Sequence, residues 1–292
     1  MTDRQTEKEV DALTGTETTG HEWDGIKELN TPMPRWWLWT FYGTIVFAVV
    51  YTVLFPAWPL ISSATGGVLG YSSRADLHQN LADVQTANQA VIERIATLPL
   101  QDILADTELT RFASAAGASA FKVNCSQCHG TGAAGASGYP NLNDDSWIWG
   151  GTIDDIHYTI SHGVRSATDP DTRFNLMPNF GVDGMLDRAQ IKDMVAYVAG
   201  LSGIEADPAS PDAHQTFLDN CAGCHGEDAR GMAELGAPDL TDAIWLYEGS
   251  VASIEAQLTQ ARHGMMPAWS EKLDDVTIKE LAIYVHGLGG GQ

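Results

Sequence analysis

The chain has 292 residues, of which 38 are acidic and 16 basic, so its formal net charge is −22. This balance argues against a nucleic-acid partner, because phosphates attract positively charged surfaces. Residues 1–35 contribute −4, so −18 lies beyond them. Acidity of that size suits docking of a basic protein, or serves only to keep the exposed part in solution.

Residues 36–55 (WWLWTFYGTIVFAVVYTVLF) contain no charged side chain. About 20 apolar residues in a helix span the hydrocarbon core of a bilayer. Tryptophans at both ends, Trp36 and Trp58 among them, are typical of membrane interfaces. The segment therefore predicts one transmembrane helix, with a buried soluble helix as the alternative. A cleaved signal peptide fits poorly, because an acidic tail separates the apolar run from Met1.

The basic residues near this span predict its orientation. Lys27 and Arg35 precede the span, and the next basic residue is Arg74. Because positive charge collects on the inner side of a membrane, residues 1–35 are predicted to be a cytoplasmic N-terminal segment. The rest of the chain is then expected on the periplasmic side of a bacterial inner membrane, crossed once.

Residues 56–109 are predicted to form a juxtamembrane amphipathic helix and a connector. Apolar residues recur there at intervals of three, four and seven, as on one face of a helix. This face could pack on the protein itself or on a partner subunit. Its members are Leu77, Leu81, Val84, Val91, Ile95 and Leu98.

Two CXXCH motifs, residues 125–129 (CSQCH) and 221–225 (CAGCH), contain all four cysteines of the chain. The pattern is typical of covalent attachment of haem c. Each cysteine bonds to a haem vinyl group and the histidine is the proximal iron ligand. A redox dithiol or half a zinc site is the alternative for a single CXXC. Two matching copies predict two haem c groups, held by Cys125, Cys128, Cys221 and Cys224, with His129 and His225 on iron.

The motifs lie within an internal repeat, which indicates two copies of one domain. The first copy carries an insertion, residues 164–176, whose Asp-Pro-Asp sequence predicts a surface loop. The matched pairs are Phe121 and Phe217, Asn124 and Asn220, Pro140 and Pro238, Trp147 and Trp245, His162 and His263, Met177 and Met266, and Tyr197 and Tyr284.

Each copy resembles a small class I cytochrome c domain, predicted at residues 110–204 and 212–292 with a linker at 205–211. In that family an N-terminal helix ending near CXXCH and a C-terminal helix cross through an aromatic pair. The resemblance implies pairing of Phe121 with Tyr197, and of Phe217 with Tyr284. Helical periodicity independently predicts two buried faces: Ile191, Met194, Val195 and Val198, and Ile278, Leu281, Ile283 and Val285.

Met177 and Met266 are each followed by proline and match the axial-ligand loop of this family. A methionine thioether as distal ligand raises the potential of a His-ligated haem. The alternative is that both fill gaps in the core. Met265 adjoins Met266 but lacks the Met-Pro spacing.

His162 and His263, each followed by glycine, are two further candidates for iron ligands. The sequence favours a helix end at both positions, because glycine there adopts positive φ readily.

Residues 21–37 (HEWDGIKELNTPMPRWW) closely resemble the N-terminal signature of the dihaem CcoP or FixP subunit of cbb3-type cytochrome c oxidases. With the span, both CXXCH motifs and both Met-Pro loops in family order, the resemblance covers nearly the whole chain. It implies a subunit that accepts electrons from a soluble or membrane-bound cytochrome c. Electrons then pass through a monohaem cytochrome subunit to the catalytic haem-copper subunit, where oxygen is reduced and protons are pumped. The family also implies crossed ligation, Met177 to the Cys221/Cys224 haem and Met266 to the Cys125/Cys128 haem, although sequence leaves ligation within each copy open.

The predicted fold class is all-α, with one transmembrane helix followed by two tandem cytochrome c domains. The predicted function is electron transfer within a terminal oxidase complex, without catalysis of its own. A stand-alone membrane-anchored electron shuttle is the alternative. A dihaem peroxidase fits less well, because it needs one open or weakly ligated haem and both copies offer a methionine.

Overall fold

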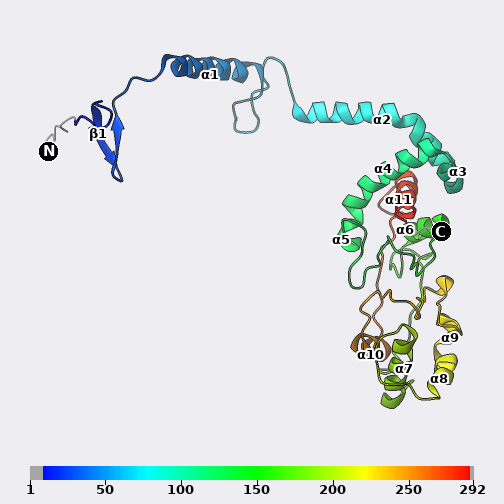
Figure 1. Cartoon of the computed structure of the whole chain (residues 1–292). Coiled ribbons are helices and arrows are strands. Elements are labelled where there is room, and N and C mark those ends of the chain that lie inside the picture. The colour runs from blue at the N-terminus through cyan, green and yellow to red at the C-terminus, as the bar shows by residue number, and fades with distance from the viewer. Residues whose placement is uncertain (1–8, 290–292) are drawn as a thin grey trace. The chain divides into compact units, whose positions relative to one another are not determined.

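The computed structural model describes residues 9–289 of the chain. Packing divides the chain into two compact units, Met1–Ala87 and Asn88–Gln292. Helices dominate both units (Figure 1). The described elements are β1 (Thr18–Trp23), β2 (Ile26–Leu29), α1 (Arg35–Leu54), α2 (Ser73–Thr97), α3 (Leu100–Ala105), α4 (Thr107–Asn124), α5 (Ser126–His129), α6 (Ile153–His162), α7 (Arg188–Leu201), α8 (Ala213–Asn220), α9 (Ala222–His225), η1 (Ala233–Leu235), α10 (Val251–Thr259) and α11 (Asp275–His286).

A β-hairpin opens the first unit and departs from the all-α expectation. Strands β1 and β2 pair antiparallel, with Trp23 opposite Ile26. The two residues between them, Asp24 and Gly25, both have positive φ, 50° and 84°. This is the geometry of the tight turns that join hairpin strands, in which Asp-Gly is strongly preferred. The Asp-Gly pair in the sequence favours such a turn, although an all-α fold was predicted.

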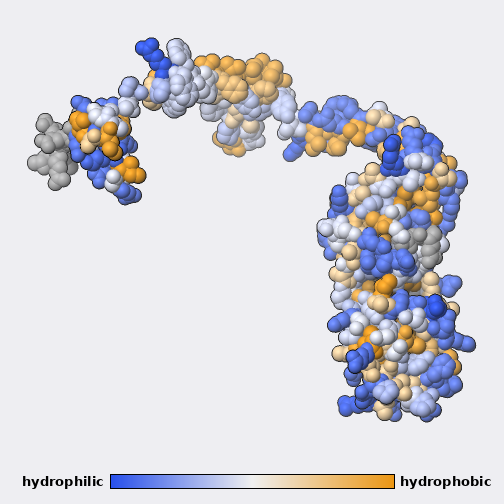
Figure 2. All heavy atoms as spheres, viewed as in Figure 1, coloured by the Kyte–Doolittle hydropathy of each residue, from blue (hydrophilic) through white to orange (hydrophobic). Residues whose placement is uncertain are grey.

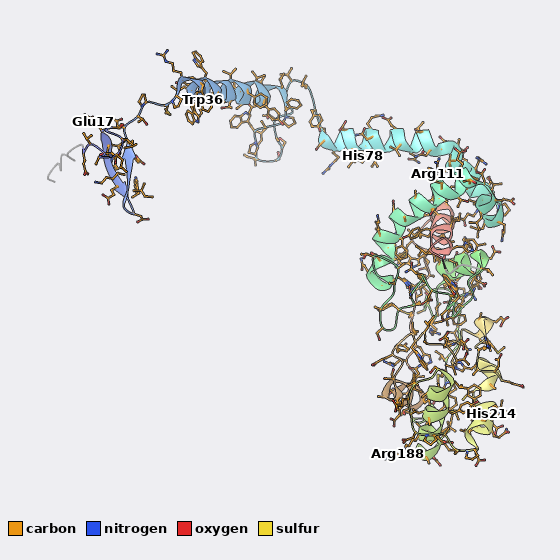
Figure 3. The ribbon with its side chains drawn as sticks, in the orientation of Figure 1. Glu17, Trp36, His78, Arg111, Arg188 and His214 are labelled. Carbon is orange, nitrogen blue, oxygen red and sulfur yellow. The ribbon has the colours of Figure 1, made fainter. Side chains whose placement is uncertain are left out.

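Helix α1 coincides with the predicted span to within one residue at each end. Its most apolar stretch of 18 residues has a mean hydropathy of 1.6, and none of that stretch is buried inside the protein. Among the described residues it is the one helix long and apolar enough to cross a membrane. Trp36 lies at its N-terminal end (Figure 3).

Helix α2 matches the amphipathic helix predicted after the span, but its apolar face is divided. Leu77, Leu81 and Val84 are more than half exposed in the first unit. Further along, Val91 and the fully buried Ile95 join the core of the second unit. The C-terminal part of this face therefore packs within the protein itself.

The second unit contains two lobes, each with its own apolar core. Lobe 1 combines the end of α2 with α3, α4, α6 and α11. Lobe 2 combines α7, α8 and α10. Both predicted faces are buried, that of α7 in lobe 2 and that of α11 in lobe 1. Figure 1 shows α11 beside α4 at one end of the unit, and α7 beside α8 and α10 at the other.

Each lobe draws helices from both sequence repeats, so the expected aromatic pairing is wrong. The ring of Phe121 lies 5.4 Å from that of Tyr284, and the ring of Tyr197 lies 5.5 Å from that of Phe217. The Tyr197 hydroxyl also bonds Nδ1 of His214 on α8, at 2.8 Å. The two repeats have therefore exchanged their C-terminal helices.

The connections explain this exchange. Only 11 residues separate the end of α7 from the start of α8, and elements joined by a short connection usually pack side by side. Residues 204–210 have no regular secondary structure, and Ser210 bonds back to Asp193 of α7. Once α7 covers α8, helix α4 is left for α11.

The contact between α4 and α11 is unusually close at one glycine. A Cβ atom on Gly117 would lie 2.1 Å from the carbonyl oxygen of Glu280 and 2.8 Å from Cβ of Tyr284. Real side chains do not approach backbone so closely. Only glycine permits this crossing distance.

We expect Gly117→Ala to lower the free energy of unfolding. Alanine normally stabilises a helix by about 1 kcal/mol relative to glycine, but the clash with α11 outweighs that gain. Denaturant unfolding of the full chain, followed by circular dichroism, measures the change. Gly200→Ala is the matched control, because Gly200 lies in α7 with nothing within 4 Å of its Cβ position. If both variants gained stability equally, α11 would not be seated against Gly117.

Candidate functional site

The two CXXCH motifs adopt the same local structure. Each forms a single helical turn, α5 or α9, directly after the longer helix that carries the aromatic residue. The amide of Cys125 donates to the carbonyl of Phe121, and that of Cys221 to the carbonyl of Phe217. In both turns the amides of the second cysteine and of the histidine donate to the carbonyl of the first cysteine. The repeat is therefore conserved in backbone geometry as well as in sequence spacing.

Both motif histidines are oriented by a proline carbonyl. Nδ1 of His129 lies 3.1 Å from the oxygen of Pro140, and Nδ1 of His225 lies 3.0 Å from that of Pro238. A carbonyl oxygen only accepts, so Nδ1 carries the proton and Nε2 keeps a free lone pair. Burial lowers the pKa of both imidazoles, which favours this neutral form. Both rings line the same cavity. Such rings are prepared to bind a metal through Nε2.

The first cysteine of each motif is held as a thiol. Burial raises the pKa of Cys125 and of Cys221 to about 11, and the neighbouring cysteine adds to the shift. A redox dithiol depends on the thiolate form, which this environment disfavours. The first cysteine of each motif therefore suits covalent attachment as a neutral thiol better than redox chemistry.

One cavity of about 410 Å³ reaches both motifs. All four cysteines and both motif histidines line it, together with Met177 and Met266. Most of the remaining lining is apolar or aromatic, including Trp147, Trp245, Leu142 and Leu240. An apolar wall with imidazole and thioether groups fits haem, which is flat, apolar and metal-centred.

The two Met-Pro loops cross between the repeats, as the helices do. Met266 packs on the core of lobe 1, which contains Phe121 and Cys125, while Met177 packs on the core of lobe 2. Met266 and Val164 exchange two backbone hydrogen bonds of 2.9 Å. Met265, by contrast, is 65 % exposed.

Neighbouring loops hold both methionines in these places. Gly163 has φ +71°, and its missing Cβ would lie 2.3 Å from the Met266 carbonyl oxygen. On the other side, Asn179 accepts from the amide of Ala261, and Val182 donates to the carbonyl of Thr259. The insertion at 164–176 is therefore a surface loop except at its first residues, which form part of the crossing.

His162 and His263 differ from each other. His162 ends α6 and is followed by Gly163 with positive φ, as expected. His263 does not end a helix, because α10 stops at Thr259, so the expectation is wrong there. Nε2 of His263 instead lies 3.1 Å from the carbonyl oxygen of Met177. This contact orients the Met177 loop from the other repeat.

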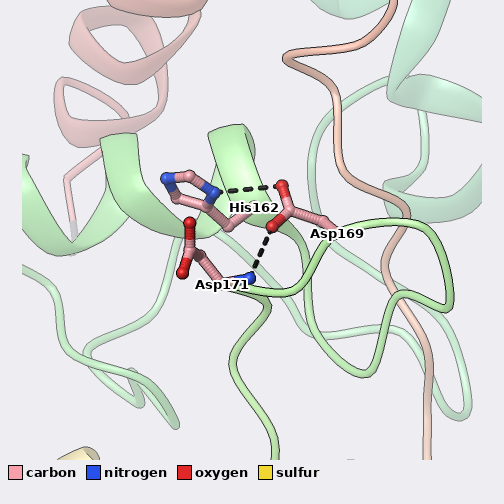
Figure 4. Close-up of side chains that lie close together, drawn as sticks. All are labelled: His162, Asp169 and Asp171. Atoms are coloured by element: carbon pink, nitrogen blue, oxygen red, sulfur yellow. Dashed lines mark hydrogen bonds and ion pairs between the residues drawn. The ribbon is translucent and has the colours of Figure 1, made fainter.

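His162 faces the insertion loop and does not line the cavity (Figure 4). Its Nδ1 bonds a carboxylate oxygen of Asp169 at 3.0 Å. The other oxygen of Asp169 accepts from the amide of Asp171 at 2.8 Å. The three side chains offer ligand atoms within 4.8 Å of one another. These hydrogen bonds explain why the three side chains lie together. They form a hydrogen-bonded clasp that holds the insertion loop to the end of α6.

Two arginines of the cavity lining carry positive charge that sequence analysis missed. Arg165 donates to the carbonyls of Gly264 (2.6 Å) and Asn175 (2.9 Å). The Arg262 guanidinium lies 4.1 Å from the ring centre of Tyr247. Neither forms an ion pair with a carboxylate among residues 9–289. Arg165 is the second residue of the insertion, and only the crossing of the repeats brings it to the cavity.

Comparison with known protein families agrees with this arrangement along the chain. Residues 15–62 match the N-terminal domain of cytochrome oxidase-cbb3, FixP. Residues 114–202 match the cytochrome c family, and residues 209–285 match cytochrome c oxidase, cbb3-type, subunit III.

Full-length relatives decide the family. The cbb3-type cytochrome c oxidase subunit CcoP of Cereibacter sphaeroides is 52 % identical, over 94 % of this chain and 95 % of its own length. Subunit FixPc of Rhizobium leguminosarum bv. viciae is 53 % identical, over 98 % and 99 %. The chain belongs to the CcoP/FixP family of cbb3-type oxidase subunits. Its cytochrome c domains imply covalently bound haem c, and α1 with this family membership indicates a membrane-anchored protein.

We expect Asp169→Ala to loosen the insertion loop. The change removes the bond to His162 and the bond from the Asp171 amide. Loss of about 1 kcal/mol would speed hydrogen exchange of residues 164–176 about fivefold. Exchange measured by mass spectrometry tests this. Asp171→Ala is the control, because it keeps both bonds. Equal acceleration by the two changes would contradict the hydrogen-bonded clasp and indicate a shared cation instead.

Proposed function

We propose that this protein is the membrane-anchored dihaem electron-transfer subunit of a cbb3-type terminal oxidase. The observation that carries the proposal is the cavity reached by two CXXCH motifs, each with a methionine of the other repeat beside it. Haem iron, when bound, supplies reversible one-electron transfer. Two such sites within one packed unit suit relay of electrons rather than oxygen chemistry.

Each proposed ligand has a defined place in the cavity. Cys125 and Cys128 would hold one haem c through thioether bonds, and Cys221 and Cys224 the other. His129 and His225 would bind iron through Nε2, because Nδ1 of each is engaged by a proline carbonyl. The distal ligands in this proposal are crossed. Met266 serves the haem of the first motif, and Met177 that of the second.

The arginines of the cavity suit the carboxylate side chains of haem. Arg165 is partly buried in a largely apolar cavity, where a charge without a partner is costly, so its guanidinium favours a negative group. Arg262 lines the same cavity but is exposed, so it offers its charge without that cost. Arg165 and Arg262 have no carboxylate of the described chain as an ion-pair partner and line the space that haem would fill. We propose that they neutralise haem propionates.

Anchorage and partners follow from the first unit and from charge. Lys27 and Arg35 before α1 favour a cytoplasmic N-terminus, which places the lobes in the periplasm. A catalytic haem-copper subunit and a monohaem cytochrome c subunit are the proposed partners in the membrane. The −18 charge beyond residue 35 suits capture of a basic cytochrome c as donor.

The complex itself can be tested by capture. A tagged copy of the chain, extracted with mild detergent, should retain the catalytic and monohaem subunits and oxidise reduced cytochrome c with uptake of oxygen. Reciprocal capture through a tag on the catalytic subunit is the control. Recovery of the dihaem chain alone in both directions would favour the stand-alone electron shuttle.

Crossed ligation predicts which haem responds to which methionine. Met266→His should lower the midpoint potential of the Cys125/Cys128 haem, because imidazole favours ferric iron more than a thioether does. Met177→His should lower that of the Cys221/Cys224 haem. Spectroelectrochemical titration measures both potentials.

Two controls assign the shifts. Met265→His should leave both potentials unchanged, because Met265 is exposed beside Met266. Combining each methionine variant with serines at one cysteine pair removes one haem and identifies the other. A Met266→His shift that persists without the Cys125/Cys128 haem would show ligation within each repeat and overturn the crossed assignment.

A further inference from the structure

The segment between α1 and α2 lacks charged residues, as a membrane-embedded segment does, although it lies beyond the end of α1. No charged residue occurs between Arg35 and Arg74, so the uncharged stretch outlasts α1 by 19 residues. A water-exposed connector of this length normally carries charge. The 20 residues of α1 already cover about 30 Å, the thickness of the hydrocarbon core. The remaining uncharged residues therefore need another environment.

This segment folds back onto the C-terminal end of α1. The amide of Val68 donates to the carbonyl of Val53 at 2.9 Å, and that of Leu69 to the carbonyl of Leu54 at 3.1 Å. Gly67 has φ +67°, and a Cβ atom there would lie 2.3 Å from the Leu54 oxygen. The last carbonyls of a helix lack partners within it. Without water an unsatisfied backbone group has no other partner, so these bonds matter more at a membrane than in water.

The turn of the segment also satisfies its own backbone. Leu60 donates to the carbonyl of Ser63, and Thr65 to that of Trp58. The Thr65 hydroxyl accepts from the amides of Ala57 and Trp58. Two of its residues are prolines, which have no N–H to satisfy. These bonds close the turn, while Ser62 and Ser63 remain exposed at it.

The large side chains of residues 56–71, by contrast, are apolar and point away from the protein. Ile61 at the tip is completely exposed, and the ring of Tyr71 lies 5.8 Å from that of Phe55. Orange atoms in Figure 2 continue from α1 onto this segment. Adjoining exposed apolar side chains of this kind seldom face water in a soluble protein. The exposed apolar members are Trp58, Leu60, Ile61, Val68, Leu69 and Tyr71.

We propose that residues 56–71 form a membrane-interface hairpin, which lies at the boundary between phospholipid headgroups and acyl chains beside the C-terminal end of α1. The proposal rests on the membrane anchoring proposed above. Its support is the continuous lack of charge, the bonded backbone and the exposed apolar tip. Trp58 and Tyr71 are of the two residue types that prefer this boundary. A lipid surface therefore covers the patch.

The hairpin would fix both the depth of α1 and the starting point of α2. Helix α2 begins at Ser73, two residues after the hairpin, and Arg74 is its first charged residue. The hairpin then holds the base of α2 at the membrane surface. The chain would leave the bilayer at a defined point rather than through a loose linker.

A photoreactive side chain at Ile61 identifies what covers the tip. A diazirine-bearing amino acid placed there in the full chain, within the intact complex in native membranes, forms a carbene that inserts into its neighbour. Mass spectrometry of the peptide should show phospholipid adducts in severalfold excess over water adducts. Predominant water insertion, or predominant crosslinking to another subunit, would overturn the proposal.

Two further positions separate this proposal from membrane anchoring as such. Val182 is also apolar and 62 % exposed, but lies in lobe 2, so it should give water adducts. Val46 lies in the middle of α1 and is 63 % exposed. Adducts with water at both Val46 and Ile61 would refute the span itself. Lipid or protein adducts at Val46 with water adducts at Ile61 would refute only the hairpin.

Discussion

The packing of α11 against α4 is the contact on which the second unit depends. It is possible because Gly117 lets the helix backbones approach, and it brings Tyr284 onto Phe121 beside the first CXXCH turn. It also carries the preceding Met-Pro loop across, so that Met266 pairs with Val164. Lys279 of the same helix donates to the carbonyls of Ile95, Ala96 and Leu98, which fastens the end of α2. This one helix crossing thus positions Met266, the core of lobe 1 and the C-terminal end of α2.

The same crossing places the polar and charged side chains that face the two Met-Pro loops. Arg165 reaches the cavity because the first residues of the insertion lie against the second Met-Pro loop, and its Nε bonds Gly264 of that loop. His263 approaches the Met177 carbonyl from the opposite repeat in the same way. Polar groups of one repeat therefore orient the potential ligands of the other.

The sequence predicted several local features of the fold well, because they depend on short spacings. The span of α1 and the buried faces of α7 and α11 all depend on residues a few positions apart. The exchange of helices escaped prediction because both repeats carry the same aromatic pattern, so Phe121 fits Tyr197 and Tyr284 equally well. Distance along the chain, set by the short link between α7 and α8, decides between them. The β1–β2 hairpin was not predicted although Asp24-Gly25 favours such a turn, because its strands, of six and four residues, lack a clear alternation of apolar and polar side chains.

The exchange also imposes an order on biogenesis. If the N-terminus stays in the cytoplasm and the part beyond α1 is exported in chain order, the Cys125 motif arrives well before Met266 and α11, the last described helix. Under the proposed orientation, lobe 1 must wait for nearly the whole remaining chain before its core can close. The first attachment site therefore stays open to the enzymes that join haem to cysteine. The second has α7 ready before its own motif emerges, so the two cofactors would be installed on scaffolds of different completeness.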